Sequence, residues 1–131
     1  MWYVAIYVAV GSAIGGVGRF LLGGLVQRVA GGTFPWGTLV INVTGSVLLG
    51  FLYRYATDSA AISPEMRALL TIGFCGGYTT FSTFSFETVR LLEDGELTRG
   101  FLYLGLSVVL ALGGTLLGIA AGRELLALRR G

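Results

Sequence analysis

The chain has 131 residues, of which 54% are hydrophobic and 12% are charged, and its mean hydropathy is +0.80. This composition is typical of an integral membrane protein and excludes an ordinary soluble domain. The formal net charge of +2 is too small and too scattered for a nucleic-acid-binding surface, so we expect no nucleic acid partner. Histidine is absent and Cys75 is the single cysteine, which excludes an intrachain disulfide and removes the commonest metal ligand.

Four apolar stretches long enough to cross a bilayer account for nearly all of the chain. We therefore predict an all-α integral membrane protein, with one four-helix transmembrane domain over residues 1–131. The expected helices cover residues 2–29, 36–55, 65–92 and 99–128. The first stretch lacks the basic start and short apolar core of a cleaved signal peptide, so we expect it to be retained as a helix.

The first predicted helix, residues 2–29, contains Gly11 and Gly15 at the GxxxG spacing that lets helix backbones approach closely. Arg19 follows in the same apolar stretch. Its guanidinium either extends to the nearer membrane interface or lines an aqueous vestibule that attracts anions. The sequence favours neither alternative.

The second predicted helix, residues 36–55, follows a turn that contains glycine and proline. Thr38, Asn42 and Ser46 recur every four residues, so they form one polar stripe on an apolar helix. An asparagine at membrane depth costs free energy unless it is paired. The stripe therefore either hydrogen-bonds to a neighbouring helix or presents donors to a pore.

The third predicted helix, residues 65–92, contains the most informative segment of the chain, GFCGGYTTFSTFSFE at Gly73–Glu87. Adjacent glycines weaken a helix, so we expect an interruption near Gly76–Thr79 that frees backbone carbonyls. Non-helical backbone persists at membrane depth only where it is buried in protein or lines water. The interruption therefore indicates either close helix packing or a solute pathway.

Phe81 and Phe84 follow the interruption and share one helix face, because they are three residues apart. Glu87 lies one turn further and is the only acid placed inside a predicted span. An ionisable group at such a position is a candidate for function. No base or second acid accompanies it in the segment, so we expect no enzymatic activity.

The fourth predicted helix, residues 99–128, contains a double GxxxG pattern at Gly114, Gly118 and Gly122. Tyr103 and Ser107 share a face of this helix at a spacing of four residues. Because the first and fourth helices are both rich in glycine, we expect one of them to supply a close contact between two copies of the chain.

The arginines are distributed almost evenly between the two expected sides of the membrane. Five lie on the side of the termini and three on the opposite side, namely Arg54, Arg67, Arg123, Arg129 and Arg130 against Arg28, Arg90 and Arg99. Lys and Arg near helix ends set the orientation of a membrane protein. This weak bias slightly favours cytoplasmic termini, and it is also what a protein inserted in both orientations would show.

Permeation suits these residues better than catalysis, because an ion that enters a bilayer must exchange its water for fixed dipoles. The chain offers hydroxyl and amide donors at Thr38, Asn42, Ser82, Thr83, Tyr103 and Ser107. It also offers phenyl rings, whose edges are electropositive. Such donors suit an anion, whereas carbonyls freed at a helix interruption suit a cation. A unit of this size is thin for enclosing a pore, so we expect an oligomer.

Three segments together resemble the CrcB/Fluc family of fluoride channels: GGVGRFLL at Gly15–Leu22, WGTLVINVTGS at Trp36–Ser46 and GGYTTFSTFSFET at Gly76–Thr88. The resemblance covers the whole chain. It implies a small prokaryotic protein of the inner membrane that exports fluoride passively. It further implies an antiparallel, dual-topology homodimer of four-helix subunits, with two pores and a central sodium ion bound where the third helices are broken.

The resemblance also assigns roles to individual residues. It implies that the backbone carbonyls of Gly76 and Thr79 bind the sodium ion, and that Phe81 and Phe84 contact fluoride. Asn42 falls at the pore asparagine of the family, Arg19 at its vestibule arginine, and Glu87 at the acid after the motif. The positions along or near the polar track of the family are Ser82, Thr83, Tyr103 and Ser107. Ala111 departs from the family pattern, since some members carry a serine there.

Two other classes of protein remain open from the residues. One is a proton-coupled exporter of fluoride or of small molecules, built like the small multidrug transporters. Those transporters have a similar size but carry an acid in the first helix, where this chain has Arg19. The other is a membrane scaffold that transports nothing, in which hydroxyls and glycines only pack helices together.

Overall fold

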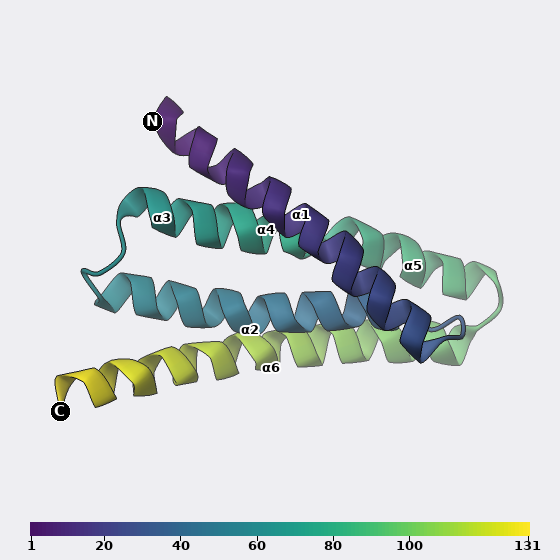
Figure 1. Cartoon of the computed structure of the whole chain (residues 1–131). Helices are drawn as coiled ribbons and strands as arrows, with labels where there is room; N and C mark the ends of the chain where they lie inside the picture. Colours follow the sequence, from purple (N-terminus) through teal and green to yellow (C-terminus); the bar gives the residue numbers. More distant parts are fainter.

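A computed structural model describes residues 1–131, and every regular element in it is helical. Three helices are long and apolar enough to cross a membrane: α1 (Trp2–Ala30), α2 (Trp36–Asp58) and α6 (Leu97–Arg130). Four shorter elements connect α2 to α6, namely α3 (Pro64–Ala68), η1 (Leu69–Cys75), α4 (Gly76–Tyr78) and α5 (Phe81–Glu93). Figure 1 shows α2 and α6 side by side, the α3–α5 segment along them, and α1 crossing that segment at an angle. The predicted all-helical membrane fold is confirmed.

The helices extend slightly beyond their predicted bounds. The largest difference is at the end of α2, which continues to Asp58 instead of residue 55. Arg54 forms an ion pair with Asp58 across one helical turn, with 2.7 Å between Nη2 and Oδ2. The Thr57 hydroxyl also donates to the Tyr53 carbonyl, at 2.7 Å. These bonds satisfy groups in the last turn and explain why the helix does not end earlier.

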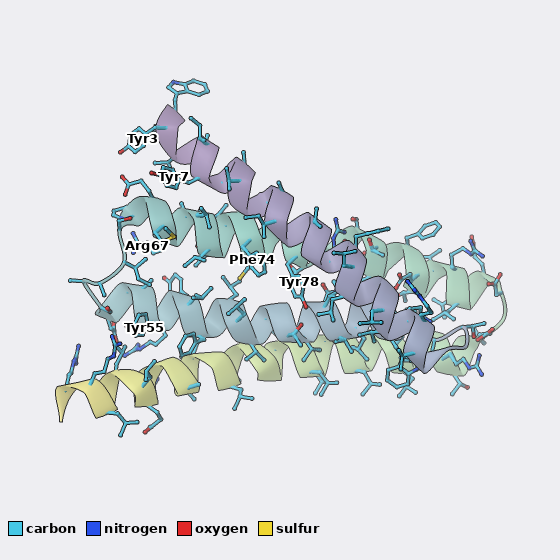
Figure 2. The ribbon with its side chains drawn as sticks, in the orientation of Figure 1. Tyr3, Tyr7, Tyr55, Arg67, Phe74 and Tyr78 are labelled. Atoms are coloured by element: carbon cyan, nitrogen blue, oxygen red, sulfur yellow. The ribbon has the colours of Figure 1, made fainter.

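The start of α3 follows from its capping residues. The Ser63 hydroxyl accepts a hydrogen bond from the Met66 amide at 3.2 Å, and Pro64 occupies the first helical position. Both features are typical of a helix start. The chain then adopts the wider π-helical form over η1, before the single turn of α4. Tyr3, Tyr7, Arg67 and Tyr55 all lie at this end of the molecule (Figure 2).

The interruption lies at Thr79 and Thr80, where the backbone is extended, with φ/ψ of −90°/159° and −151°/118°. The adjacent glycines do not cause it, because Gly76 and Gly77 remain helical in α4. The interruption thus begins at the last residue of the predicted range Gly76–Thr79, directly after the helical turn that holds the two glycines. A Cβ at Gly77 would lie 2.6 Å from the Ser12 carbonyl oxygen, so Gly77 serves close packing against α1. Threonine hydroxyls favour the interruption, since they bond to nearby backbone groups.

The GxxxG glycines of α1 are in contact with η1 and α4 of the same chain. Cβ atoms added at Gly11 and Gly15 would lie 2.2 Å from the carbonyl oxygens of Leu69 and Phe74. Lipid provides no hydrophobic force between helices, so such close backbone contact is a main source of attraction. These glycines hold α1 against the interrupted segment.

The glycines of α6 are covered in the same way by α2. A Cβ at Gly118 would lie 2.0 Å from the Val47 carbonyl oxygen, and one at Gly50 would lie 2.3 Å from the Thr115 carbonyl oxygen. Both glycine-rich stripes are thus used within one chain. These particular glycines therefore pack within one chain, whereas Gly16 and Gly24 of α1 and Gly105 and Gly113 of α6 have no neighbour within 4 Å of an added Cβ.

Candidate functional site

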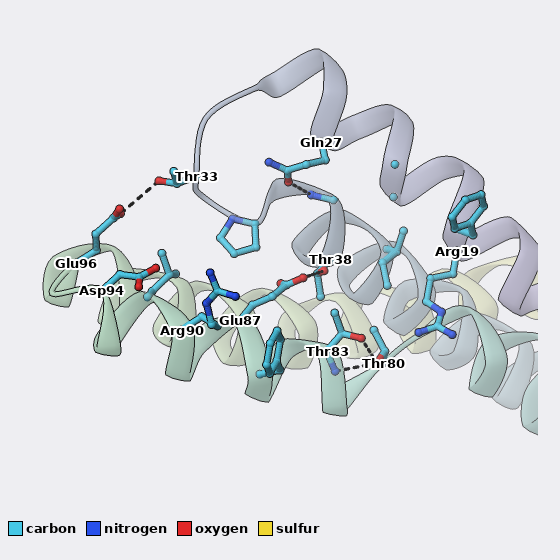
Figure 3. Close-up of a pocket in the computed structure, with 18 of the residues that line it drawn as sticks. Arg19, Gln27, Thr33, Thr38, Thr80, Thr83, Glu87, Arg90, Asp94 and Glu96 are labelled. Carbon is cyan, nitrogen blue, oxygen red and sulfur yellow. Dashed lines mark hydrogen bonds between the residues drawn. The ribbon is translucent and has the colours of Figure 1, made fainter.

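A cavity of about 760 Å³ lies between α1, the start of α2 and α5. Its wall brings together four residues singled out in the sequence: Arg19, Thr38, Thr83 and Glu87. Figure 3 shows them around one space, together with Thr80 and Arg90. Residues from three separate helices therefore form one polar surface, although they are far apart along the chain.

Arg19 contributes a positive charge to this wall. The two ion pairs of the molecule are Arg54–Asp58 and Arg99–Glu96, so no carboxylate neutralises Arg19. Its half-buried position on the cavity wall places an uncompensated guanidinium beside water-accessible space. The same wall also carries Arg90 and the carboxylates of Glu87, Asp94 and Glu96, so Arg19 is a local positive charge in a lining of mixed sign.

Glu87 is the point where three helices meet. Its Oε1 accepts a hydrogen bond from the Thr38 hydroxyl of α2 at 2.8 Å. Its Oε2 accepts one from the Tyr103 hydroxyl of α6, also at 2.8 Å. Hydrogen bonds to a carboxylate are stronger than neutral ones. The carboxylate that the sequence leaves without a partner therefore ties α2, α5 and α6 together.

Aromatic rings lie directly beside this group. The rings of Phe81 and Phe84 are tilted by 54°, with 5.6 Å between their centroids, and Phe84 lies 5.3 Å from Tyr103. Phe84 is only 8% exposed and Tyr103 is fully buried, whereas Phe81 is 79% exposed. The sequence analysis did not identify Phe34, whose ring meets Tyr103 edge-on at 5.6 Å. Its place in a turn next to a proline carries no periodic signal.

Asn42 reaches across to the interruption. Its Nδ2 donates to the Thr80 carbonyl at 3.0 Å, and its Oδ1 accepts from the Thr80 amide at 2.8 Å. The Ser46 hydroxyl donates instead to the Asn42 carbonyl within α2, at 2.7 Å. The polar stripe thus has two parts, since Thr38 and Asn42 contact other segments while Ser46 bonds to its own helix.

The remaining hydroxyls differ in their surroundings. The Thr80 hydroxyl accepts from the Thr83 amide at 3.1 Å and donates to the Thr83 hydroxyl at 3.0 Å, and Ser82 lies exposed beside them. Ser107 is 7% exposed, and its Oγ is buried without a hydrogen-bond partner. Buried polar atoms are nearly always paired, so an unpaired hydroxyl indicates a place for water or for another polar species.

The carbonyls of Gly76 and Thr79 lose their usual helical donors. In a continuous helix the Thr80 amide would donate to Gly76 and the Thr83 amide to Thr79. Here these amides bond instead to the side chains of Asn42 and Thr80. Gly76 is exposed, and a Cβ added there would meet nothing within 4 Å.

A cation at the interruption would depend on these backbone oxygens. The molecule has no group of three or more His, Cys, Asp or Glu residues that could hold a metal ion. Backbone carbonyls are ligands that suit hard cations. The freed carbonyls of Gly76 and Thr79 therefore fit a weakly held ion such as sodium better than a transition metal.

Gln27 organises the rim of the cavity and was missed by the sequence analysis. Its Nε2 donates to the carbonyls of Gly32 and Phe34, at 3.3 and 3.1 Å. Its Oε1 accepts from the Gly37 amide at 3.1 Å, in the first turn of α2. A single amide near the end of an apolar helix gives no spacing pattern, so only the tertiary contacts identify it.

Known proteins resemble this chain over most of its length. A family model described as CrcB-like protein, Camphor Resistance (CrcB), matches residues 6–119. A protein of Geobacter sulfurreducens named fluoride-specific ion channel FluC is 52% identical over 118 residues, which cover 90% of this chain and 95% of the relative. Proteins with the same name from Geobacter sp. strain M21 and Hahella chejuensis are 49% and 45% identical, covering 92% of this chain and 97% and 95% of theirs.

Proposed function

Because the chain belongs to the CrcB-like family, we propose that it is a fluoride-selective ion channel that lets fluoride leave the cell passively. One structural observation carries the proposal. An unneutralised arginine stands on the wall of a cavity that also carries Thr38, Thr83 and Glu87, with Phe84 and Tyr103 packed behind them. Arg19 offers an anion a positive charge in this cavity, and the Thr38 and Thr83 hydroxyls lie on the same wall, which also carries Arg90 and the carboxylates of Glu87, Asp94 and Glu96. The proposal assigns the chain no enzymatic activity.

Fluoride is small and strongly hydrated, so a selective pathway must replace its water with closely spaced donors. We assign this pathway to the residues that the sequence analysis identified: Arg19, Thr38, Asn42, Phe81, Ser82, Thr83, Phe84, Glu87, Tyr103 and Ser107. The unpaired Ser107 hydroxyl supports this assignment, because it can donate to an anion without breaking another hydrogen bond. Electropositive ring edges add attraction without a fixed charge that would trap the ion.

Glu87 limits access to two of these donors. Its carboxylate occupies the Thr38 and Tyr103 hydroxyls, each at 2.8 Å, so fluoride competes with it for both. A negative charge also repels an anion in a site of low dielectric. Fluoride therefore reaches these hydroxyls when the carboxylate turns away from them.

The membrane arrangement is part of the proposal. We expect the interrupted α3–α5 segment to cross the inner membrane together with the three long helices, in an antiparallel homodimer of two oppositely inserted copies. The exposed positions of Phe81 and Gly76 beside the interruption support a contact there with a second backbone. The GxxxG glycines of α1 and α6 are already covered within one chain.

Sodium is the ion that we propose for this interface. The carbonyls of Gly76 and Thr79, two from each copy, would hold it without a charged side chain. Bound there, it would supply a fixed positive charge that stabilises the interruption and favours an anion nearby. The chain's own contribution is the pair of carbonyls released from helical hydrogen bonding.

Reconstituted liposomes test the proposed function. Vesicles loaded with potassium fluoride and given valinomycin should release fluoride to an external electrode, whereas chloride-loaded vesicles should retain chloride. Dissipating the proton gradient should not slow the release, which separates a channel from a proton-coupled exporter. A failure to release fluoride, or an equal release of chloride, would overturn the proposal and favour a scaffold or an unselective pore.

A further inference from the structure

We infer that Asn42 is a positioning residue: its side chain pairs with both backbone groups of Thr80, keeps the helix interrupted there, and releases the Gly76 carbonyl. The effect that this has on fluoride passage depends on the proposed function. The effect on the backbone does not, since it follows from the contacts of Asn42 alone.

The Asn42 side chain forms a two-bond pair with the backbone of Thr80. One amide side chain satisfies the Thr80 amide at 2.8 Å and the Thr80 carbonyl at 3.0 Å. These are the two backbone groups that an extended residue between two helices leaves without helical partners. A buried backbone group without a partner is costly, so the interruption needs an external donor and acceptor on the same residue. An asparagine side chain offers both in one plane.

The pair with Asn42 prevents a helical hydrogen bond at Thr80. If the helix continued through residue 80, the Thr80 amide would donate to the Gly76 carbonyl. Asn42 takes this amide as its own partner, so the Gly76 carbonyl loses the donor that a continuous helix would give it. The Asn42 side chain of α2 therefore removes a hydrogen-bond donor from the Gly76 carbonyl, which lies in α4.

Neighbouring residues of α2 reinforce the same position. The hydroxyls of Thr44 and Tyr78 are hydrogen-bonded at 2.8 Å. A Cβ at Gly45 would lie 2.3 Å from the Thr79 methyl group, so only glycine leaves room for that side chain. The segment Asn42–Gly45 thus contacts every residue from Tyr78 to Thr80. Asn42 is the member of the segment that bonds to the backbone itself.

The pairing also restricts what Asn42 can offer an ion. Its amide group has two N–H donors, and one of them is directed at the Thr80 carbonyl. A single N–H remains, and its direction is fixed by the pair with Thr80. Asn42 therefore acts on fluoride mainly through the backbone that it holds, and through Phe81, the residue that follows Thr80.

Hydrogen–deuterium exchange tests this inference in the full-length protein in lipid nanodiscs. Thr80 lies on the cavity wall, so water can reach its amide once the pair is broken. In Asn42→Ser and Asn42→Gln, exchange over residues 79–84 should become about tenfold faster, as expected for the loss of one net hydrogen bond. The Gln variant keeps the amide but adds a methylene, so it cannot keep the planar pair. Ser46→Ala is the matched control, because its hydroxyl bonds only within α2.

Fluoride release from liposomes is measured on the same variants. The inference predicts faster exchange together with slower release in both Asn42 variants, and neither change in Ser46→Ala. Slower fluoride release with unchanged amide exchange would overturn the inference, because Asn42 would then act by contacting the ion directly. Faster exchange with normal release would also overturn it, since the pair would not matter for conduction. If the unmodified protein released no fluoride, the proposed function would fail, and exchange alone would still decide whether Asn42 holds the interruption.

Discussion

The Tyr103 hydroxyl donates to the Glu87 carboxylate at 2.8 Å, and this bond joins the middle of α5 to α6 inside the apolar part of the molecule. Tyr103 has no exposed surface, so water cannot replace the carboxylate as its partner. The pair is therefore both a structural link between two helices and a direct contact between a carboxylate and a hydroxyl of the proposed fluoride pathway.

Removing the Tyr103 hydroxyl should slow fluoride release and lower stability. Tyr103→Phe keeps the ring against Phe84 but leaves Glu87 with the Thr38 hydroxyl alone. We expect a loss of about 1–2 kcal/mol in the free energy of unfolding, the cost of a partly unsatisfied buried carboxylate. Liposome flux and thermal denaturation in detergent measure the two effects. Tyr55→Phe is the control, since the Tyr55 hydroxyl bonds to Arg129 at the far end of α6. Normal flux in Tyr103→Phe would remove Tyr103 from the pathway.

Replacing the phenylalanine rings should separate conduction from packing. Phe81→Ile and Phe84→Ile keep bulk but remove the electropositive ring edge, so fluoride release should fall at least about tenfold in both. Within one copy only Phe84 is packed, at 8% exposed against 79% for Phe81, so Phe84→Ile should lower the stability of the subunit by about 1 kcal/mol. Phe101→Ile, at an exposed position of α6, should change neither quantity. Unaltered release from both variants, with the protein still dimeric, would mean that the rings only pack.

Removing sodium should reduce fluoride release without unfolding the protein. The carbonyls of Gly76 and Thr79 would lose the ion that we propose for them, and the interruption would lose a fixed positive charge. Protein purified and reconstituted without sodium should conduct slowly, and sodium added back should restore the rate. Flux that is undiminished in sodium-free buffer would refute this role.

Alanine at the glycines of α6 should distinguish covered positions from open ones. At Gly118 the new methyl would lie 2.0 Å from the Val47 carbonyl oxygen, whereas at Gly113 it would meet nothing within 4 Å. Gly118→Ala should therefore force α2 and α6 apart and cost about 1–3 kcal/mol of stability, as over-packing does. Thermal denaturation compares it with Gly113→Ala, which should match the unmodified protein. Equal stability of the two variants would show that the α2–α6 contact is looser than described.

The sequence alone predicted much of this protein, because the relevant signals are local. Long apolar stretches predict helices that cross a membrane, and the four-residue spacing of Thr38, Asn42 and Ser46 predicts a polar stripe. The predicted start at residue 65 lies one residue from the observed start of α3 at Pro64, because a helix cap such as Ser63 depends on residues next to one another. The predicted interruption near Gly76–Thr79 overlaps the observed one at Thr79 and Thr80, although Gly76 and Gly77 themselves remain helical.

Only the tertiary structure decided what these residues contact. It pairs Asn42 with Thr80 and Glu87 with Thr38 and Tyr103, across separations of 38, 49 and 16 residues. It also uses the glycines of α1 and α6 inside the chain, which the GxxxG spacing could not reveal. A spacing pattern states which face of a helix is polar or small. The neighbour of that face depends on how the helices cross, and this is set by close backbone packing between segments far apart in the sequence.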